Sequence, residues 1–365
     1  MTRKPAKSVI LVGGGHTHAL VLNALKTAPL SDAHVTVINP GTTAPYSGML
    51  PGFVAGHYTR RDLDIDLGVL SQKVGADLID GKAVSMDPEK KLILLADGTE
   101  LPYDFASIDV GITSRMDALP GFLKYGIPAK PLGAFSNKWD AFRVSKGPKH
   151  VAIIGGGIAG AELAMAMAFA LNAQTEPVSV RLLDRGQILS ANNQKTQARV
   201  RKELSANSVD VMEGVDVAAV TSTGVTLADG SAIEANFVVG AAGATPHTWV
   251  KDTGLTLKDG FITVDEALQT SAAGVFAVGD CAHMTSNPRP KAGVYAVRQA
   301  PVLLQNLRNA LSGAPLKSYH PQSDYLKLVS LGGKRAFGEK RGWGAAGCLV
   351  WRLKDKIDRD FMNQF

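Results

Sequence analysis

Short apolar runs that end at glycines, each followed by a helical stretch, recur along the chain. Residues 8–12 and 151–154 are such runs, and residues 19–26 and 162–171 carry helical periodicity or strong helix propensity. Apolar runs of this length are typical of strands that are buried on both faces of a parallel sheet. The pattern therefore predicts two strand–turn–helix units in an α/β fold.

The turn in the second unit has the spacing G-x-G-x-x-G, formed by Gly155, Gly157 and Gly160. The first glycine allows a tight turn, the second lets a pyrophosphate approach the backbone, and the third lets helix and strand pack closely. The next predicted strand ends at Asp184, whose carboxylate can accept from a ribose 2′-hydroxyl and repels a 2′-phosphate. These features predict a dinucleotide site that favours NADH, although the neighbouring Arg185 could hold the phosphate of NADPH.

The turn in the first unit is a variant that reads Gly13-Gly14-Gly15-His16-Thr17-His18. His18 stands where the third glycine would be, and Asn39 replaces the acid at the end of the next predicted strand. Asparagine can still accept a hydrogen bond, but without assistance from charge. Two histidines at i and i+2 on a helix start point apart, so packing or a phosphate contact is favoured over a metal site. A second Rossmann-like unit and no metal are predicted.

Three later apolar runs also end at glycines, at Gly111, Gly243 and Gly279. The strands after residue 236 are predicted to complete the first sheet, so the second unit is inserted into the first. We expect one dinucleotide-binding domain over residues 1–115 and 237–320, a second over 116–236, and a small C-terminal segment over 321–365.

Other segments are predicted from local signals. Residues 43–58 are rich in glycine and proline yet apolar, which indicates a loop that covers a ligand. Residues 92–95 and 101–104 flank an Asp-Gly pair and predict a β-hairpin. Residues 292–311 predict a long helix, and residues 209–227 predict a small cluster of strands.

Composition narrows the class of protein. Hydrophobic residues make up 45% of the 365 residues and charged residues 20%, which is typical of a globular chain. No apolar run reaches the roughly 18 residues that span a bilayer. Two cysteines far apart in sequence indicate no disulfide framework and a cytoplasmic setting. The net charge of +6 comes without a nucleic-acid motif, so anionic cofactors or the inner face of a membrane are favoured as partners over nucleic acid.

With two nested dinucleotide-binding units, the chain resembles the pyridine nucleotide–disulfide oxidoreductase superfamily of flavoproteins. Residues 43–51, 274–280 and 291–299 look most like type II NADH:quinone oxidoreductases and their relatives. The variant first turn, together with residues 45–51, is similar to the flavoprotein module fused in front of selenide, water dikinase. The resemblance implies FAD at the first unit and NAD(P)H at the second, face to face for hydride transfer.

The resemblance also implies roles for individual residues around FAD. Asn39 would reach the adenosine ribose, and Asp280 would accept from a ribityl hydroxyl, with a helix N-cap as the alternative role. Pro51 would lie near the isoalloxazine ring. The remaining residues expected to line the two cofactors are Gly13, Gly14, Gly15, His16, Gly111, Gly155, Gly157, Gly160, Asp184, Gly243, Gly279, Gly293 and Val294.

Two residues are expected to be catalytic. Glu162, just after the third glycine, matches a family glutamate near the nicotinamide, where it would orient groups and handle a proton. The alternative is an ordinary first-turn glutamate favoured by the helix dipole. Lys291 would lie at the pyrimidine side of the flavin and stabilise charge on the reduced ring.

The electron acceptor is predicted to be a quinone, with departures from the family pattern. Gly293 and Val294 stand where type II NADH dehydrogenases have an Ala-Gln pair. No Cys-x-x-Cys or Cys-x4-Cys occurs, so a redox-disulfide mechanism is excluded. A small sulfur or selenium species, an acidic redox protein, and a non-catalytic NADH-responsive role remain as alternatives.

The C-terminal segment carries an apolar stripe on a predicted helix, at Leu353, Ile357 and Phe361. Four basic residues are interleaved with this stripe: Arg352, Lys354, Lys356 and Arg359. Such a helix can lie in a membrane interface with its basic residues at the head groups. The alternative is packing on the body of the protein or on a second subunit in a homodimer.

Overall fold

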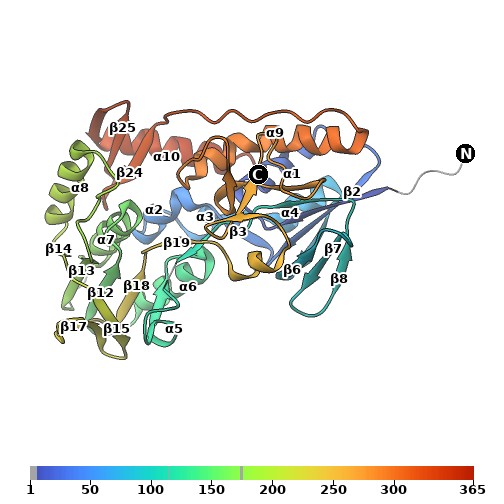
Figure 1. Cartoon of the computed structure of the whole chain (residues 1–365). Coiled ribbons are helices and arrows are strands. Elements are labelled where there is room, and N and C mark those ends of the chain that lie inside the picture. The colour runs from blue at the N-terminus through green and yellow to red at the C-terminus, as the bar shows by residue number, and fades with distance from the viewer. Residues whose placement is uncertain (1–5, 115, 173–175) are drawn as a thin grey trace, which may run out of the picture.

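The computed structural model describes residues 6–114, 116–172 and 176–365. It contains two units, each built on a parallel five-stranded sheet, that lie side by side (Figure 1). The first sheet has the order β22-β9-β1-β2-β5. Its strands are β1 (Lys7–Val12), β2 (Ala33–Asn39), β5 (Asp77–Asp80), β9 (Phe105–Ile108) and β22 (Val275–Ala277). The predicted α/β fold with two Rossmann-like units is confirmed.

The second sheet has the order β11-β18-β12-β13-β14. Its strands are β11 (Gly126–Pro128), β12 (Lys149–Ile154), β13 (Val178–Asp184), β14 (Val209–Glu213) and β18 (Phe237–Gly240). We expected β18 to complete the first sheet, but it pairs with β12 in parallel, with Val151 opposite Phe237. β14 likewise pairs with β13 instead of joining the small strand cluster. β18 is an apolar run that either sheet could bury, whereas β14 alternates apolar and polar residues and stands at the edge of its sheet. The sequence pattern could therefore not assign the partners of either strand.

Smaller sheets, which are antiparallel except for the parallel pair of β21 (Phe261–Val264) and β23 (Ala282–Met284), flank the two large sheets. The expected hairpin forms from β7 (Leu92–Leu95) and β8 (Glu100–Pro102). The other small strands are β3 (Thr43–Pro45), β4 (Asp64–Asp66), β6 (Ala83–Asp87), β10 (Thr113–Ser114), β15 (Val217–Thr221), β16 (Gly224–Leu227), β17 (Ala232–Glu234), β19 (Ala244–Thr245), β20 (Leu257–Lys258), β24 (Lys327–Ser330), β25 (Ala336–Lys340) and β26 (Trp343–Gly347).

Helices cover the two sheets. The first unit carries α1 (His16–Leu25), α4 (Leu67–Val74) and α9 (Gly293–Ser312), of which α9 confirms the long helix that the sequence predicts. The second unit carries α6 (Leu132–Val144), α7 (Ile158–Leu171) and α8 (Gln194–Ala206). Short helices are α2 (Leu50–Val54), α3 (Arg60–Leu63) and α5 (Phe122–Tyr125). α7 is apolar on nearly all sides because the second sheet, α2 and β24 all pack on it.

Residues 43–58 are not the simple loop that their glycines and prolines suggest. They form β3, a short 3₁₀ turn (Ser47–Met49) and α2. Met49, Phe53 and Val54 are buried in the core of the second unit. The apolar content of this segment therefore serves packing between the two units.

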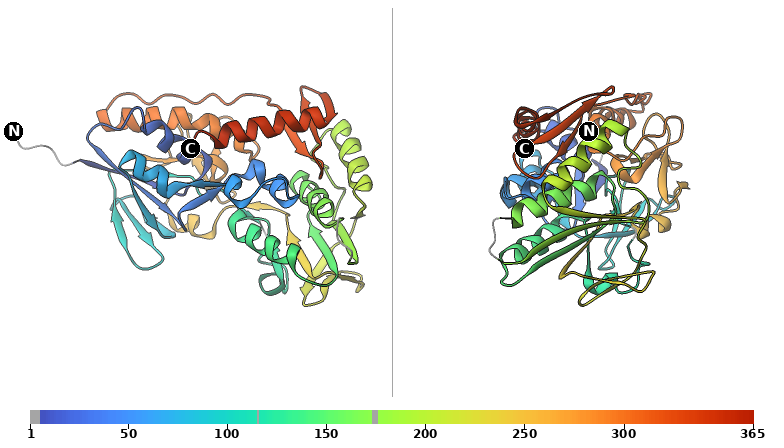
Figure 2. Two further views of the ribbon diagram at one scale, coloured as in Figure 1. Left: turned by 180° about the vertical axis from the view of Figure 1, so that it is seen from behind. Right: turned by 90° about the vertical axis from the view of Figure 1, so that its left-hand side faces the viewer.

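The two units are connected by two crossing strands. β10 leads into the second unit, β19 leads out of it, and the two pair antiparallel. After α9 the chain runs back along the molecule to the sheet of β24, β25 and β26, and ends in α10 (Cys348–Met362) (Figure 2). This return places the C-terminal segment against α7 of the second unit.

Candidate cofactor and electron-transfer site

The two glycine turns have equivalent backbone geometry. Gly13 and Gly155 have φ values of +95° and +117°, a region that favours glycine. Gly15 and Gly157 are the N-cap residues of α1 and α7, with nearly identical backbone angles. Each turn therefore points the start of a helix at the same kind of site, as expected for two dinucleotide-binding units.

The residue at the end of the second strand braces each turn. Asn39 Oδ1 accepts from the amide of Gly14 at 3.0 Å, and Asp184 Oδ2 accepts from the amide of Gly156 at 2.6 Å. The Asn39 amide group also donates to the carbonyl of Gly41 at 2.9 Å. Asn39 and Asp184 thus occupy corresponding places beside the glycines, and Asn39 supplies the same brace without charge.

His18 stands in place of the third glycine, and its ring is held beside the turn by hydrogen bonds. In the second unit, a Cβ at Gly160 would lie 1.9 Å from the carbonyl oxygen of Gly155, so only glycine fits. In the first unit, His18 Nδ1 lies 2.7 Å from the carbonyl oxygen of Gly13, and Nε2 lies 2.8 Å from Ser107 Oγ. Burial lowers the pKa of His18 to about 4, so the ring is neutral. Both ring nitrogens are used in packing, the role the sequence favoured over a metal.

Asp109, which follows β9, lies in this site although it was not among the predicted site residues. Its Oδ2 accepts from the amides of Thr17 at 2.9 Å and His18 at 3.2 Å, at the start of α1. The residue is 3% exposed. Burial raises the pKa of Asp109 to about 7, the charge of Asp280 adds to this, and the two amides oppose it. In the sequence, the place of this acid directly after a predicted buried strand could have marked it as a candidate site residue.

The turn at Gly279 and Asp280 lies beside this carboxyl. Gly279 has φ of +66°, and its amide donates to Gln299 Oε1 at 2.7 Å. Asp280 lies within the 3₁₀ turn Gly279–Cys281 and is not the N-cap of a helix. Its carboxylate is 3.4 Å from the ammonium of Lys130. The N-cap alternative for Asp280 is therefore wrong.

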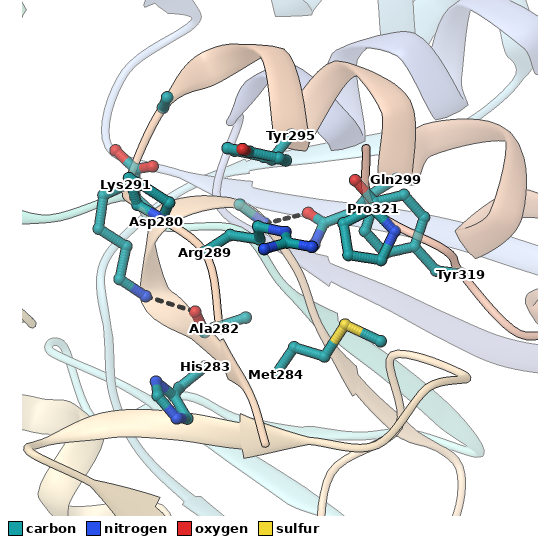
Figure 3. A pocket seen from close by; sticks show the side chains of 13 residues that line it. Asp280, Ala282, His283, Met284, Arg289, Lys291, Tyr295, Gln299, Tyr319 and Pro321 are labelled. Atoms are coloured by element: carbon teal, nitrogen blue, oxygen red, sulfur yellow. Dashed lines mark hydrogen bonds between the residues drawn. The ribbon is translucent and has the colours of Figure 1, made fainter. Parts of the chain in front are cut away.

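A small pocket opens beside Asp280, between β23 and the start of α9 (Figure 3). Lys291 lines it, with its ammonium 2.5 Å from the carbonyl oxygen of Ala282 and over the ring of Phe261. Burial lowers the pKa of Lys291. The Tyr319 hydroxyl, also in this lining, is buried without a hydrogen-bond partner among the described residues. The Lys291 side chain thus donates its hydrogen bond to the backbone of β23.

The start of α9 meets the first turn at His16. A Cβ at Gly293 would lie 3.2 Å from His16 Nδ1. The His16 ring packs on Tyr46 at 5.2 Å and Phe361 at 5.8 Å, between ring centroids. Burial lowers the pKa of His16 to about 4. His16 is therefore a neutral ring between α1, α9 and α10, and Val294 follows Gly293 in the first turn of α9.

Glu162 belongs to a charge cluster, with the buried residues Lys354 and Asp358, that the sequence did not reveal. Its Oε1 accepts from the amide of Ser330 at 2.7 Å. Lys354 donates to Asp358 Oδ2 at 2.6 Å and to the carbonyl of Gly48 at 2.7 Å. Burial raises the pKa of Glu162 to about 7, and the charge of Lys354 opposes this rise. We call Glu162, Lys354 and Asp358 the carboxylate–lysine cluster. Glu162 and Lys291, the two residues expected to be catalytic, have different partners.

The surface of α10 differs from the stripe that the sequence suggests. Phe361 is buried, at 7% exposed, while Leu349, Leu353 and Ile357 are 72%, 47% and 41% exposed. The stripe is therefore displaced by one turn. These three exposed residues recur at i, i+4 and i+8 of α10, on one face of the helix, and form what we call the C-terminal apolar patch.

The basic residues of α10 are largely neutralised. Lys354 is buried in the carboxylate–lysine cluster, so it cannot face head groups. Lys356 pairs with Asp360 at 2.6 Å, and Arg359 pairs with Asp355 at 3.0 Å. The aspartates one turn away from these cations therefore cancel most of the positive charge that the sequence suggests for this helix. No helix in the described part of the chain is long and apolar enough to cross a membrane.

The remaining predicted residues lie at the junction of the units. Gly111 and Gly243, both with φ of +67°, stand just before the crossing strands. Pro51 is buried in the short helix α2. Cys281 is buried and Cys348 is exposed, and both are free thiols. Burial raises the pKa of Cys281 to about 12, so that thiol is not a nucleophile.

Comparisons with known proteins agree with this geometry. The family model described as pyridine nucleotide-disulphide oxidoreductase matches residues 7–300. The NADH dehydrogenase-like protein YutJ of Bacillus subtilis is 25% identical over 342 residues, which cover 91% of this chain and 92% of that protein. A probable ferredoxin reductase of Castellaniella defragrans is 26% identical over 83% of this chain and 74% of its own length. The sulfide:quinone oxidoreductase of Aquifex aeolicus has a similar fold, with a TM-score of 0.79 at 18% identity, covering 98% of this chain and 92% of that chain.

Proposed function

Because the chain belongs to the pyridine nucleotide–disulphide oxidoreductase family, whose members are FAD-dependent NAD(P)H oxidoreductases, we propose that it transfers electrons from NADH to a quinone. When bound, FAD supplies the hydride-accepting chemistry. Gly13, Gly15, Asn39, Gly279 and Asp280 would hold it. These residues fit FAD because the first glycine turn and Gly279 present backbone without side chains to the site. At each of these glycines an added Cβ atom would collide with a neighbouring atom.

The second turn would hold the nicotinamide nucleotide. A Cβ at Gly157 would meet no atom within 4 Å, so there is open space at the start of α7 for a pyrophosphate. Asp184 lies at the end of β13, where a carboxylate disfavours a 2′-phosphate. Arg185 is exposed beside it and forms no ion pair within the described residues. These features support NADH as the preferred donor, with NADPH as the weaker one.

The carboxylate–lysine cluster would handle the proton that accompanies reduction of a quinone. A carboxyl with a pKa of about 7 can both hold and release a proton near neutral pH. The positive charge of Lys354 keeps the pKa of Glu162 from rising further, so the group stays within the useful range. Glu162 would therefore move a proton at its carboxyl oxygen, and Lys354 would position and tune it.

One observation carries the choice of a quinone. The C-terminal apolar patch lies on α10, and the same helix carries Lys354 and Asp358 of the carboxylate–lysine cluster, to which α7 contributes Glu162. An exposed apolar surface is therefore on the helix that also holds the charged partners of the proton carrier. A lipid-dissolved quinone needs both features. Among the comparisons, an NADH dehydrogenase-like protein and a sulfide:quinone oxidoreductase point the same way.

An electron-accepting redox protein is the second candidate. A relative is a probable ferredoxin reductase, and the chain carries a net charge of +6 that would suit an acidic partner. A small sulfur or selenium acceptor has less support, because the buried Cys281 and the exposed Cys348 do not form a reactive pair. A protein that binds NADH without turnover is the remaining alternative.

Anaerobic stopped-flow measurements would separate these functions. The protein is reduced with NADH and then mixed with a short-chain quinone, a ferredoxin or a polysulfide. We expect flavin reoxidation to be fastest with the quinone. Replacement of Glu162 by glutamine should slow reoxidation but not reduction by NADH. Faster reoxidation by ferredoxin, or slow reoxidation by every acceptor, would contradict the proposal.

Contact with a membrane surface would bring the protein to its quinone. Because most cations on α10 are paired, we expect attachment to depend on apolar insertion more than on charge. Replacement of Leu349 by serine should lower sedimentation with lipid vesicles at both low and high salt. Leu123, which is 77% exposed on α5, provides the matched control, and its serine variant should sediment like the unmodified protein.

Failure of the full-length protein to sediment with vesicles would refute the membrane contact. If the protein is a dimer by light scattering and the Leu349 variant is a monomer, the C-terminal apolar patch is a subunit interface instead.

A further inference from the structure

Each glycine turn has one carboxylate beside it, but the carboxylates stand at different places. In the second unit it is Asp184, at the end of β13. In the first unit Asn39 stands at that place, and the acid is Asp109, at the end of the neighbouring strand β9. The counterpart of Asp109 is Ala241, since both donate their amides, at 2.8 Å, to the last residue of the central strand of their sheet. The first unit therefore has an acid where the second has a methyl group.

Asp109 occupies hydrogen-bond donors that a bound pyrophosphate needs. Its carboxylate accepts from the amides of Thr17 and His18 in the first turn of α1. The counterpart of Thr17 in α7 is Ala159, whose amide has no acceptor among the described residues. Free amides at a helix start bind phosphate oxygens. The second unit thus has these donors open, while in the first unit they are already used.

The carboxyl of Asp109 is also enclosed. A Cβ at Gly15 would lie 2.2 Å from Asp109 Cγ, and a Cβ at Gly279 would lie 2.4 Å from Asp109 Oδ1. The carboxyl therefore lies in contact with the first glycine turn and with the turn at Gly279. A diphosphate that reached the start of α1 would meet it directly, and two anions in a buried site repel each other strongly.

We propose that Asp109 is a proton-linked cofactor-binding residue, which must be neutral when FAD binds and which opposes the cofactor when it is ionised. Binding above neutral pH then takes up one proton from solvent, which converts the Asp109 carboxylate to a carboxylic acid. The neutral acid can donate to a phosphate oxygen, whereas the carboxylate cannot. The inference rests on the FAD site of the proposed function and is independent of the electron acceptor.

Among the groups that face one another at this site, Asp109 is the one that we expect to titrate near neutral pH. Burial holds the pKa of His16 and of His18 at about 4, so both rings are neutral. Burial holds the pKa of Cys281 at about 12, so the thiol stays protonated. Asp280, paired with Lys130, adds negative charge that favours the neutral form of Asp109.

The sign of the pH dependence follows from the pKa of Asp109, about 7 in the absence of cofactor. Below that pH the carboxyl is neutral, so the affinity for FAD is at its maximum. Above it the ionised fraction grows, and one coupled proton weakens binding by up to about tenfold for each pH unit.

Equilibrium titration of the apoprotein with FAD, followed by flavin fluorescence between about pH 6 and pH 9, tests the inference. The dissociation constant of the unmodified protein should rise about tenfold per unit above neutral pH. Asp109→Asn should bind FAD with a constant that is flat over this range, and about tenfold more tightly than the unmodified protein at about pH 8. Asp109→Ala copies Ala241 of the second unit and should also be flat.

Circular dichroism and NADH binding at the second unit verify that each variant is folded. A flat dissociation constant in the unmodified protein would refute the role of Asp109 and leave the FAD assignment intact. A slope that persists in Asp109→Asn would likewise refute it, because the coupled proton would then lie elsewhere. If no form binds FAD at any pH, the proposed function itself fails.

Discussion

Replacement of Lys354 by methionine tests the carboxylate–lysine cluster through its energetics. The Lys354 ammonium lies 2.6 Å from Asp358, and both residues are buried, at 7% and 4% exposed. Removing one partner of a buried ion pair leaves the other charge without compensation, which costs about 3–5 kcal/mol. Glu162 would also lose its nearby positive charge, so its pKa should rise above its present value of about 7.

Replacement of Asp358, the partner of Lys354, completes a double-mutant cycle. Asp358→Asn removes the negative charge but keeps an oxygen that can accept from the Tyr46 hydroxyl, now 3.2 Å from Asp358 Oδ1. Alone it should cost about 3–5 kcal/mol, because Lys354 is left unpaired. In the double variant neither charge is present, so we expect a coupling energy of about 2–3 kcal/mol between the two sites.

Thermal unfolding followed by circular dichroism is the assay. At about 2–4 °C per kcal/mol, each single variant should lower Tm by about 6–20 °C, and the double variant by less than the sum. The same helix offers a matched control, because Lys356 and Asp360 have the same spacing and the same 2.6 Å distance, but their side chains are 71% and 59% exposed. Lys356→Met should therefore cost at most about 0.5 kcal/mol. Equal losses for Lys354→Met and Lys356→Met, or additive effects in the cycle, would refute the reasoning.

Three further predictions follow from the cofactor turns and the thiols. Asp184→Ala should narrow the preference for NADH in stopped-flow flavin reduction, and equal rates for NADH and NADPH in the unmodified protein would show that the acid does not discriminate. Cys281→Ser and Cys348→Ser should each retain quinone reduction within about threefold, since the thiols are not paired; loss of acceptor reduction in both would indicate sulfur chemistry. His18→Ala should lower the unfolding free energy by about 2–4 kcal/mol in denaturant titrations, because two buried hydrogen bonds are lost, and an unchanged stability would contradict its packing role.

Local signals were sufficient for the repeated units. A strand, a glycine turn, a helix and a second strand lie close together in sequence, so the backbone demands at Gly13 and Gly155 are visible in their spacing. The same holds for the hairpin of β7 and β8 and for the long helix α9. In each case the residues that form the structure are neighbours along the chain.

Pairing over long distances could not be assigned in the same way. β18 is an apolar run that would suit either sheet, and only its neighbours β11 and β12 place it in the second unit. The glycines and prolines of residues 43–58 suggest a loop, yet Phe53 and Val54 complete the core of the other unit. A pattern of apolar residues shows that a segment is buried but not against which partner.

From the sequence alone, the chain is committed to two dinucleotide-binding units and to the residues that brace each glycine turn, because those demands are local. Its charged groups acquire their roles only through folding. In the sequence, Lys354 looks like an ordinary surface charge, and Asp109 is an acid at the end of a predicted buried strand with no visible partner. Only the fold brings Asp109 to the start of α1 and Lys354 to Asp358. Burial and partners set the pKa of a carboxyl and the energy of an ion pair, and both depend on residues that are distant along the chain.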